Sequence, residues 1–411
     1  MGCFYTNLQF KAMIVLVSLI LNLPLVSAKT FYVSTAGNDS NNGSISAPWR
    51  TIINAWRHSR GGDTVLVRNG IYSERQMWLR MKTQGKGSEN QYWTLKVFPN
   101  EEAVFTNARI IIDDSYVRIQ GLVFRGDVGG NSYVQAVSWG GIHEKIEILE
   151  NRFIGSQKKP PLYFIGNNSL IQGNTVDING SVSHGIYIMH GSNNIIRNNY
   201  VTGMAKYGLH IYDEDKYPNE PPPVIKNLSV ENNIITSSSS NSGIIISSGA
   251  DPPGGIPINN VVVRNNIIFN NKDYGIYIRY GGTNENIKIY NNTFYNNGGG
   301  IYIYGSVADS ITVHNNIFVS NSSGNINSHD VNTLTISHNL YWKPTLVEHG
   351  AADDYAVYQD PLFLNINEGD FRLQADSPAI DAGVDVGLPF NGKAPDLGAY
   401  EHGSSTIKNK K

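Results

Sequence analysis

The sequence is poor in cysteine and in charge. Its only cysteine among 411 residues is Cys3, so an intramolecular disulfide is excluded and stability has to come from a large buried core. Charged residues make up 16% of the chain and the net charge is -2. No broad basic field exists to hold nucleic acid or an anionic membrane surface, and we expect neither as a partner.

Long apolar runs are missing except near the N-terminus. Lys11 precedes an apolar run from Ala12 to Leu25, and small residues follow up to Ala28. This pattern predicts a secretory signal peptide cleaved after Ala28 and a secreted or periplasmic mature chain. The alternative, a transmembrane anchor, needs about 20 apolar residues. We expect a monomer that is free of the membrane after cleavage, with Cys3 removed.

A repeat fills the middle of the chain. Between Ser183 and Asn321 a glycine is followed by alternating apolar residues, and a second apolar alternation then ends in a pair of asparagines. The five leading glycines are spaced by 23 to 35 residues: Gly185, Gly208, Gly243, Gly275 and Gly300. Side chains of a strand alternate between faces, so this period predicts short strands. A fixed unit repeated in this way predicts a solenoid with one coil per repeat.

The alternation also predicts which residues face inward. The aliphatic residues one and three positions after each glycine would form ladders in the core. The asparagine pairs would form an internal ladder of amides that bond along the stack and satisfy the turns. We therefore assign the pairs a structural role: Asn198-Asn199, Asn232-Asn233, Asn265-Asn266, Asn291-Asn292 and Asn315-Asn316.

The two ends differ from the repeat. Residues 49 to 60 place Ile52, Ile53 and Trp56 on one helical face before Gly61-Gly62, which predicts a helix that caps the first coil. The predicted organisation is a signal peptide (1–28), an N-terminal strand and capping helix (29–75), the coils (76–345), a C-terminal capping segment (346–402) and a disordered tail (403–411).

These features carry a family resemblance. The opening segment from Phe31 to Asn38, the segment Gly62 to Arg68, the repeats, and the motifs at Asp360 to Phe363 and Ser377 to Gly383 resemble secreted right-handed parallel β-helix repeat proteins. That superfamily includes pectate, alginate and chondroitin lyases, mannuronan epimerases and some glycosidases. The resemblance implies an all-β, single-stranded right-handed parallel β-helix with an N-terminal capping helix and a C-terminal cap. It does not select one activity, since one fold hosts several chemistries.

Residues two and four positions after each glycine would point outward. They form a first column of Tyr187, His210, Ile245, Tyr277 and Tyr302, and a second column of Met189, Tyr212, Ser247, Arg279 and Tyr304. Stacked strands lie about 4.8 Å apart, so each column would present a row of groups to sugar rings laid in series. Alternatively, the tyrosines only stiffen the sheet through cross-strand pairing.

The columns contain the groups that cleavage of a uronate by β-elimination requires. Arg279 or a bound cation would neutralise the carboxylate, and His210 would remove the C5 proton. A tyrosine, Tyr212, Tyr187 or Tyr277, would protonate the leaving oxygen. His184 and His190 flank the preceding strand and could join this site. Further substrate contacts are expected from Tyr207, Tyr277, Tyr302, Tyr304 and Lys206.

We therefore expect a lyase that acts on an acidic polysaccharide, with three alternatives. A C5 epimerase uses the same first two steps. A glycoside hydrolase needs two carboxyl groups about 5 to 9.5 Å apart, and the columns contain none, which leaves the loop acids Asp213, Asp215 and Asp273. A non-catalytic glycan-binding or matrix protein would use the same aromatic row only to bind the glycan.

A short motif around His210 is similar to the signature of alginate epimerases and lyases, Tyr-Gly-x-Asp-Pro-His-Asp. The match holds at Tyr207, Gly208 and Asp213. It fails at His210, where the family has its catalytic aspartate, and at Ile211-Tyr212, where the family has Pro-His. Alginate specificity is therefore not carried over.

Calcium is the one cofactor that the sequence suggests. The longest irregular insertion begins at Asp213, Glu214 and Asp215, and insertions of a solenoid commonly line its working face. Carboxylate oxygens are the ligands that Ca²⁺ prefers. The alternative is a solvated acidic turn. A second insertion, residues 249 to 257, would form the opposite wall of the same groove.

Overall fold

The computed structural model describes residues 27–80, 87–126, 132–137, 142–156, 158–179, 183–213, 225–248, 255–279, 282–343 and 352–404. Most of the predicted signal peptide, including Cys3, lies outside these residues, as do Glu214 and Asp215. Within the described parts of the chain, no helix has the length and apolar character needed to cross a bilayer.

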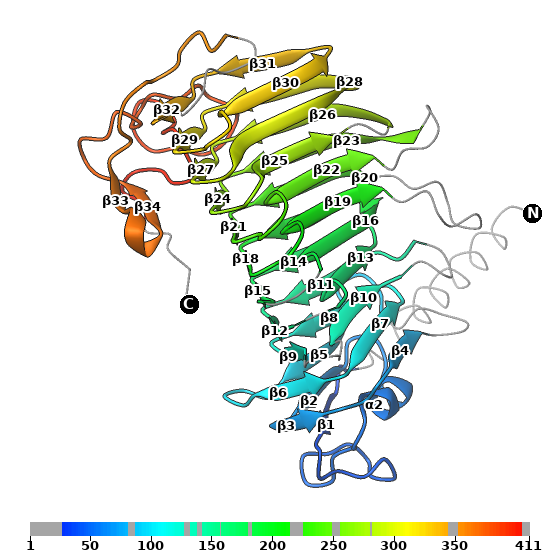
Figure 1. Ribbon diagram of the computed structural model, residues 1–411. Helices are drawn as coiled ribbons and strands as arrows, with labels where there is room; N and C mark the ends of the chain where they lie inside the picture. The colour runs from blue at the N-terminus through cyan, green and yellow to red at the C-terminus, as the bar shows by residue number, and fades with distance from the viewer. Residues whose placement is uncertain are drawn as a thin grey trace, which may run out of the picture.

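The chain winds into a parallel β-helix in which each coil contributes up to three strands (Figure 1). The five leading glycines stand at five consecutive strands of one face, and we call the whole face the glycine-led sheet. Its strands are β4 (Met77–Arg80), β7 (Arg109–Asp113), β10 (Tyr133–Ala136), β13 (Leu162–Ile165), β16 (Ile186–Ser192), β19 (Leu209–Asp213), β22 (Ile244–Ser248), β25 (Tyr274–Arg279), the first half of β28 (Gly299–His314) and β30 (Ile326–Val331).

The second alternation of each repeat forms the middle sheet. Its strands are β1 (Thr30–Val33), β2 (Thr64–Val67), β5 (Trp93–Val97), β8 (Val117–Gln120), β11 (Ile146–Leu149), β14 (Leu170–Gln172), β17 (Ile195–Arg197), β20 (Ile225–Glu231), β23 (Gly255–Arg264), β26 (Gly282–Tyr290), the second half of β28, and β31 (Leu334–Ser337). Because β16 and β28 run into both faces, these two sets of strands form one 21-stranded sheet.

An 11-stranded third sheet follows the asparagine pairs. Its strands are β3 (Gly70–Tyr72), β6 (Ala103–Thr106), β9 (Val123–Gly126), β12 (Arg152–Gly155), β15 (Thr175–Asp177), β18 (Tyr200–Thr202), β21 (Ile234–Thr236), β24 (Ile267–Phe269), β27 (Thr293–Tyr295), β29 (Ile317–Val319) and β32 (Leu340–Trp342). These strands pair in parallel and in register, so equivalent residues of successive coils stack.

The predicted aliphatic ladders are confirmed. The residues one and three positions after each leading glycine, such as Ile186 and Ile188, are fully buried in one continuous core. The leading glycines are needed for space, since a Cβ atom at Gly208 would lie 2.5 Å from Ile235 Cγ2. Aromatic rings add ladders of their own inside the coil, including Phe294, Phe318 and Tyr341.

The predicted asparagine ladder is also confirmed. The second member of each pair is buried, and its amide bonds to the equivalent amide of the next coil; Asn233 Nδ2, for example, donates to Asn266 Oδ1 at 3.0 Å. The first member instead adopts a left-handed backbone at the turn, as at Asn265 (φ 55°). Asparagine tolerates this conformation better than most residues. The pair therefore combines a turn residue with a core residue.

The N-terminal helix α2 (Ile52–His58) is shorter than the predicted span of residues 49 to 60. Its first turn is capped by Thr51, whose side chain accepts a hydrogen bond from Asn54 N, and it ends before Ser59. Trp56 packs edge-on against Trp93, with ring centroids 4.7 Å apart. The helix thus lies at the N-terminal end of the solenoid (Figure 1), and its capping role remains a prediction.

The C-terminal segment contacts the last coil and then runs back along the flank of the third sheet. Tyr341 Oη donates to Asp353 Oδ2 at 2.9 Å in the last coil. The segment then forms a hairpin of β33 (Phe363–Asn365), the 3-10 helix η1 (Ile366–Glu368) and β34 (Asp370–Leu373) beside the earlier coils (Figure 1). Outward apolar side chains of the third sheet, Ile317 among them, require this cover.

Candidate functional site

The first outward column is aligned by strand register. Tyr187 pairs with His210, His210 with Ile245, Ile245 with Tyr277, and Tyr277 with Tyr302. These residues occupy five consecutive strands of the glycine-led sheet, from β16 to β28. The residues that the sequence placed in one column therefore stand in one row along the helix axis.

The second outward column is aligned in the same way from β19 onward. Tyr212 pairs with Ser247, Ser247 with Arg279, Arg279 with Tyr304, and Tyr304 with His329. His329 on β30 was not anticipated, because its strand lacks a leading Gly-Ile-Tyr motif. Met189 lies in β16, where the register with β13 shifts, and it is buried against Tyr187 and Ile165.

A third column stands immediately before the leading glycines and was not recognised as a column from the sequence. It contains His184, Tyr207, Ser242, Tyr274 and Gly299. His184 stacks on Tyr207 with centroids 5.6 Å apart, so the residues of this pre-glycine column do meet across strands. The signal that could have revealed it is the aromatic residue before Gly208 and Gly275.

Five rings on β16, β19 and the turns before them form a compact histidine stack: His184, Tyr187, Tyr207, His210 and Tyr212. His210 is its centre, with ring centroids 4.2 Å from His184 and 4.3 Å from Tyr187, both in stacked geometry. Tyr207 and Tyr212 each lie 5.2 Å from His210. The structure thus brings together most of the residues proposed for catalysis.

Burial governs the charge of the two histidines in this stack. Burial, followed by the nearby His184 and Lys206, lowers the pKa of His210 to about 2. Burial and Lys206 lower the pKa of His184 to about 4. Both imidazoles are therefore neutral at neutral pH. Each Nδ1 atom is buried with no hydrogen-bond partner among the described residues, which favours a proton on Nε2, because buried N–H groups are seldom left unpaired.

Further along the same face, Tyr274, Tyr277 and Tyr302 form what we call the tyrosine platform. The centroid of Tyr302 lies 4.8 Å from that of Tyr274 and 5.3 Å from that of Tyr277, with both pairs stacked. Gly299 makes room for this packing, since a Cβ atom there would lie 2.3 Å from Tyr274 Cδ1. Tyr304 and His329 continue the row beside Tyr302.

Asp273 stands at the edge of the tyrosine platform. Ser242 Oγ donates to its Oδ2 atom at 3.1 Å, and burial raises the pKa of its carboxyl group. Burial likewise raises the pKa of Tyr277, with smaller contributions from Tyr207 and Asp273 among others. Tyr277 follows His210 in the first outward column with Ile245 between them, so the tyrosine platform and the histidine stack lie on the same face of the sheet.

Two proposed residues lie apart from His210. Arg279 is exposed on β25, two strands from β19 and in the neighbouring column, so about 10 Å of helix axis separates the two positions. His190 is buried at the irregular register opposite Ile165, with 4% of its surface exposed. Lys206 is exposed, and its charge acts on both His184 and His210.

Comparison with known proteins agrees with this architecture. Residues 104–255 match the family model described as a right handed beta helix region. The chain is a right-handed parallel β-helix. Models described as a protein of unknown function (DUF1565) and a domain of unknown function (DUF5123) match residues 35–77 and 287–385 of this β-helix. The comparison with curated proteins finds no match.

Several solved structures share the fold. A pectate lyase, Pel9A, is 17% identical with a TM-score of 0.65, over 92% of this chain and 98% of that chain. A rhamnogalacturonan lyase is 17% identical with a TM-score of 0.51, over 83% and 92%. A lacto-N-biosidase from Eubacterium ramulus is 13% identical with a TM-score of 0.52, over 85% and 69%. At these identities the likeness extends to the fold alone.

The predicted calcium ligands fall largely outside the described residues. Asp213 is the last residue of β19 and pairs with Ser248, while Glu214 and Asp215 are not described. Among the side chains that the structure does describe, no three histidine, cysteine or acidic residues gather in an arrangement that could hold a metal ion. Calcium binding by this loop stays a prediction.

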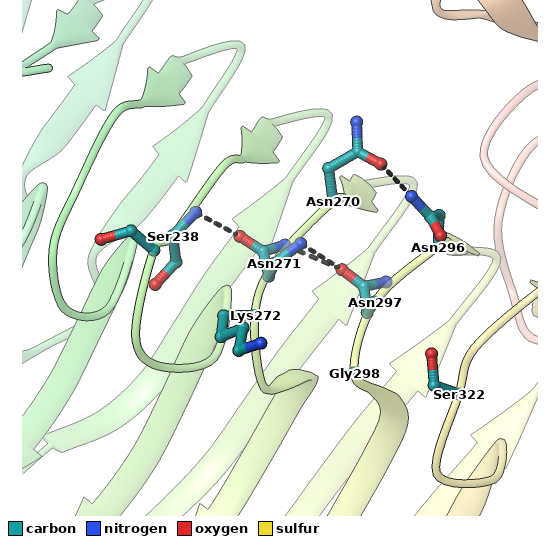
Figure 2. Close-up of a pocket in the computed structure, with 9 residues that line it drawn as sticks. Ser238, Asn270, Asn271, Lys272, Asn296, Asn297, Gly298 and Ser322 are labelled. Carbon is teal, nitrogen blue, oxygen red and sulfur yellow. Dashed lines mark hydrogen bonds between the residues drawn. The ribbon is translucent and has the colours of Figure 1, made fainter.

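A shallow hollow of about 380 Å³ lies outside the aromatic face, on the turns that lead from the third sheet to the glycine-led sheet (Figure 2). Its wall is polar: Asn296 Nδ2 donates to Asn270 Oδ1 at 2.7 Å, and Asn271 bonds to Asn297 beneath them. The remaining lining residues are Ser238, Ser239, Lys272, Gly298 and Ser322. Since its amides belong mainly to turn-stabilising ladders, we place the functional site on the aromatic face.

Proposed function

We propose that this β-helix is a secreted lyase that cleaves a uronate-containing polysaccharide by β-elimination on the outward face of the glycine-led sheet. The observation that carries the proposal is the aligned row of aromatic side chains across β16 to β30, with Lys206 and Arg279 beside it. Long grooves lined by rings and a few polar groups suit sugar chains. The lyases that share the fold support the same reading.

In this proposal the bond is cleaved at the histidine stack. Lys206 neutralises the uronate carboxylate, which acidifies the C5 proton. His210 accepts that proton, the C4–O bond breaks, a C4=C5 double bond forms, and a tyrosine gives its proton to the leaving oxygen. Tyr212 stands beside His210, with ring centroids 5.2 Å apart, and is the donor that we propose; the hydroxyl of Tyr187 is buried, and Tyr277 lies two strands from His210.

Binding of a substrate would change the low pKa of His210. A uronate carboxylate placed beside the ring favours the imidazolium form and raises this pKa, so the histidine becomes a stronger base when substrate is bound. Arg279, about two strands away, then holds the carboxylate of a neighbouring sugar rather than that of the reacting one. Ca²⁺ held by Asp213, Glu214 and Asp215 would assist that neutralisation.

A glycoside hydrolase is the second candidate, and Asp273 is the observation that favours it. A carboxyl group with a raised pKa in a sugar-binding groove has the property of a general acid. The reaction also needs a second carboxyl group about 5 to 9.5 Å away, and the two outward columns supply no acidic residue. The lyase is therefore the better supported reading.

Incubation with a panel of uronate polymers tests the proposal. A lyase produces unsaturated ends that absorb ultraviolet light, an epimerase exchanges solvent deuterium into C5 without cleavage, and a hydrolase produces reducing ends without absorbance. We expect His210→Gln to abolish the absorbance, while the exposed control His402→Gln keeps it. Sensitivity to EDTA tests calcium. Tight binding without any product on every polymer would contradict an enzyme and identify a glycan-binding protein.

A further inference from the structure

We infer that Asp273, Tyr274, Tyr277 and Tyr302 form a subsite for an uncharged sugar, so that the polymer bound on this face carries neutral sugars next to its uronates. The inference deepens the proposed function and rests on it for the identity of the polymer. It concerns a part of the face about two strands from the histidine stack.

The packing of the tyrosine platform decides what the platform offers to a ligand. Successive rings stack on one another at 4.8 and 5.3 Å, with interplanar angles of 17° and 28°. Rings stacked along the helix axis cover each other's faces, so their edges and hydroxyl groups face away from the sheet; the hydroxyl of Tyr274 also bonds to the side chain of Asn327. Tyrosine hydroxyls both donate and accept hydrogen bonds, which matches the hydroxyl groups of a sugar.

Asp273 sets the charge of this subsite. It is half-buried, fixed by the hydrogen bond from Ser242, and close enough to influence Tyr274, Tyr277 and Tyr302 electrostatically. A carboxylate accepts hydrogen bonds from hydroxyl groups strongly but repels another carboxylate. A uronate at this position would face that repulsion, whereas a neutral sugar would gain the hydrogen bonds.

No cation that could neutralise the charge of Asp273 stands beside it among the described outward columns; the candidates are Arg279 and Lys206. Arg279 stands at the far end of β25, six residues along the chain from Asp273, which corresponds to about 20 Å of extended backbone, and its charge acts on Tyr277. Lys206 lies at the histidine stack instead. The face therefore combines an acid at Asp273 with cations at Lys206 and Arg279, and a polymer that contains both neutral sugars and uronates fits this arrangement better than a homopolymer of uronate.

Binding measurements on the full chain test the inference without relying on catalysis. The probes are an oligogalacturonate, a rhamnogalacturonan oligosaccharide of similar length, and a neutral galacto-oligosaccharide, titrated by calorimetry. We expect the mixed oligosaccharide to bind about ten-fold more tightly than the homopolymer fragment. Asp273→Asn keeps the shape and removes the charge, so it should tighten oligogalacturonate binding about ten-fold and reduce the preference accordingly.

Two variants serve as controls. Asp354→Asn removes an exposed acid on the C-terminal segment and should leave all affinities unchanged. Ser242→Ala keeps the Asp273 charge, so it should retain the preference for the mixed probe, and thermal unfolding reports whether each variant is folded. Equal affinity for both uronate probes would overturn the subsite. So would an Asp273→Asn variant in which the ratio of the two affinities is unchanged. Neither result would contradict the proposed lyase activity. Binding of the neutral probe alone supports the subsite and overturns the lyase.

Discussion

Asparagine has two different structural roles in this chain, and the two members of each asparagine pair take one role each. In each pair the first asparagine takes the left-handed turn and the second enters the core ladder, where Asn292 Oδ1 accepts from both Asn266 N and Asn266 Nδ2 at 3.0 Å. The pattern of pairs was visible in the sequence. The direction of each amide was not, since it depends on the coil above.

Removal of one ladder amide should destabilise the protein strongly. Asn292 Nδ2 donates to Val263 O and Tyr290 O, so Asn292→Ala leaves several buried polar groups without partners. Each such group costs about 1 to 3 kcal/mol, and we expect a loss of roughly 3 kcal/mol or more in the free energy of unfolding. Guanidinium denaturation measures it. The half-buried control Asn259→Ala should change the value by less than about 1 kcal/mol, and an equal loss in both variants would contradict the ladder's importance.

The histidine stack predicts a dependence of stability on pH. The folded chain binds a proton at His210 only near its pKa of about 2, whereas in the unfolded chain the ordinary value of 6.5 applies. The unfolded state therefore binds more protons below pH 6.5, and stability falls as the pH drops from there. His210→Gln should remove about 2 kcal/mol of the loss between pH 7 and pH 5.

Denaturation midpoints at the two pH values measure this effect. His402→Gln, on an exposed residue of the C-terminal segment, is the matched control and should retain the full dependence. His184 contributes in the same direction, because its pKa is also lowered, to about 4. If His210→Gln and the wild type lost the same stability on acidification, the buried neutral state of His210 would be refuted.

At the scale of single elements, the glycine-led strand explains how three columns arise on the aromatic face. The glycine itself packs against the core, the next residues alternate, and the residue before it emerges at the strand's edge. The run Gly298 to Gly300 is the clearest instance. Gly300 lies close to the backbone of Asn325, and the missing side chain of Gly299 leaves room for the ring of Tyr274.

A double-mutant cycle tests the packing of Tyr274 over Gly299. Gly299→Ala should displace the ring and weaken binding of the mixed oligosaccharide about ten-fold, because the platform loses one hydroxyl from its position. In a Tyr274→Ala background the same change should have almost no further effect, since the space is then free. Calorimetric titration of the four proteins gives the coupling, and additive losses would argue against direct contact.

At the scale of the whole molecule, the C-terminal segment covers one flank of the solenoid. Phe371, with 2% of its surface exposed, packs among Ile234, Ile267 and neighbouring residues of the third sheet. Backbone bonds such as Gly398 N to Asn315 O at 2.7 Å fix the segment farther along. Without it, an apolar strip on β21 to β29 would face water and favour association between molecules.

Detachment of this segment should be measurable by proteolysis. Phe371→Asp places a charge in an apolar site and should release the segment, so that limited trypsin digestion cuts after Arg372, which lies in β34, much faster than in the wild type. Leu364→Asp is the matched control, because Leu364 is 48% exposed in the same hairpin. Equal cutting rates in all three proteins would show that Phe371 does not hold the segment in place.

The sequence by itself determined the coil, its inward ladders and most members of the two outward columns, but it misplaced the buried Met189 and missed His329. Side-chain alternation is a local property of a strand, and the leading glycines fix its phase in five repeats, so the variation of repeat length between 23 and 35 residues does not disturb it. The tertiary structure alone decided how these columns interact. Ring stacking on His210, its lowered pKa, the separation of Arg279 from His210 and the flank covered by Phe371 all depend on which coils become neighbours. A local sequence pattern does not predict these contacts and pKa shifts, because burial and electrostatic interactions depend on residues of neighbouring coils.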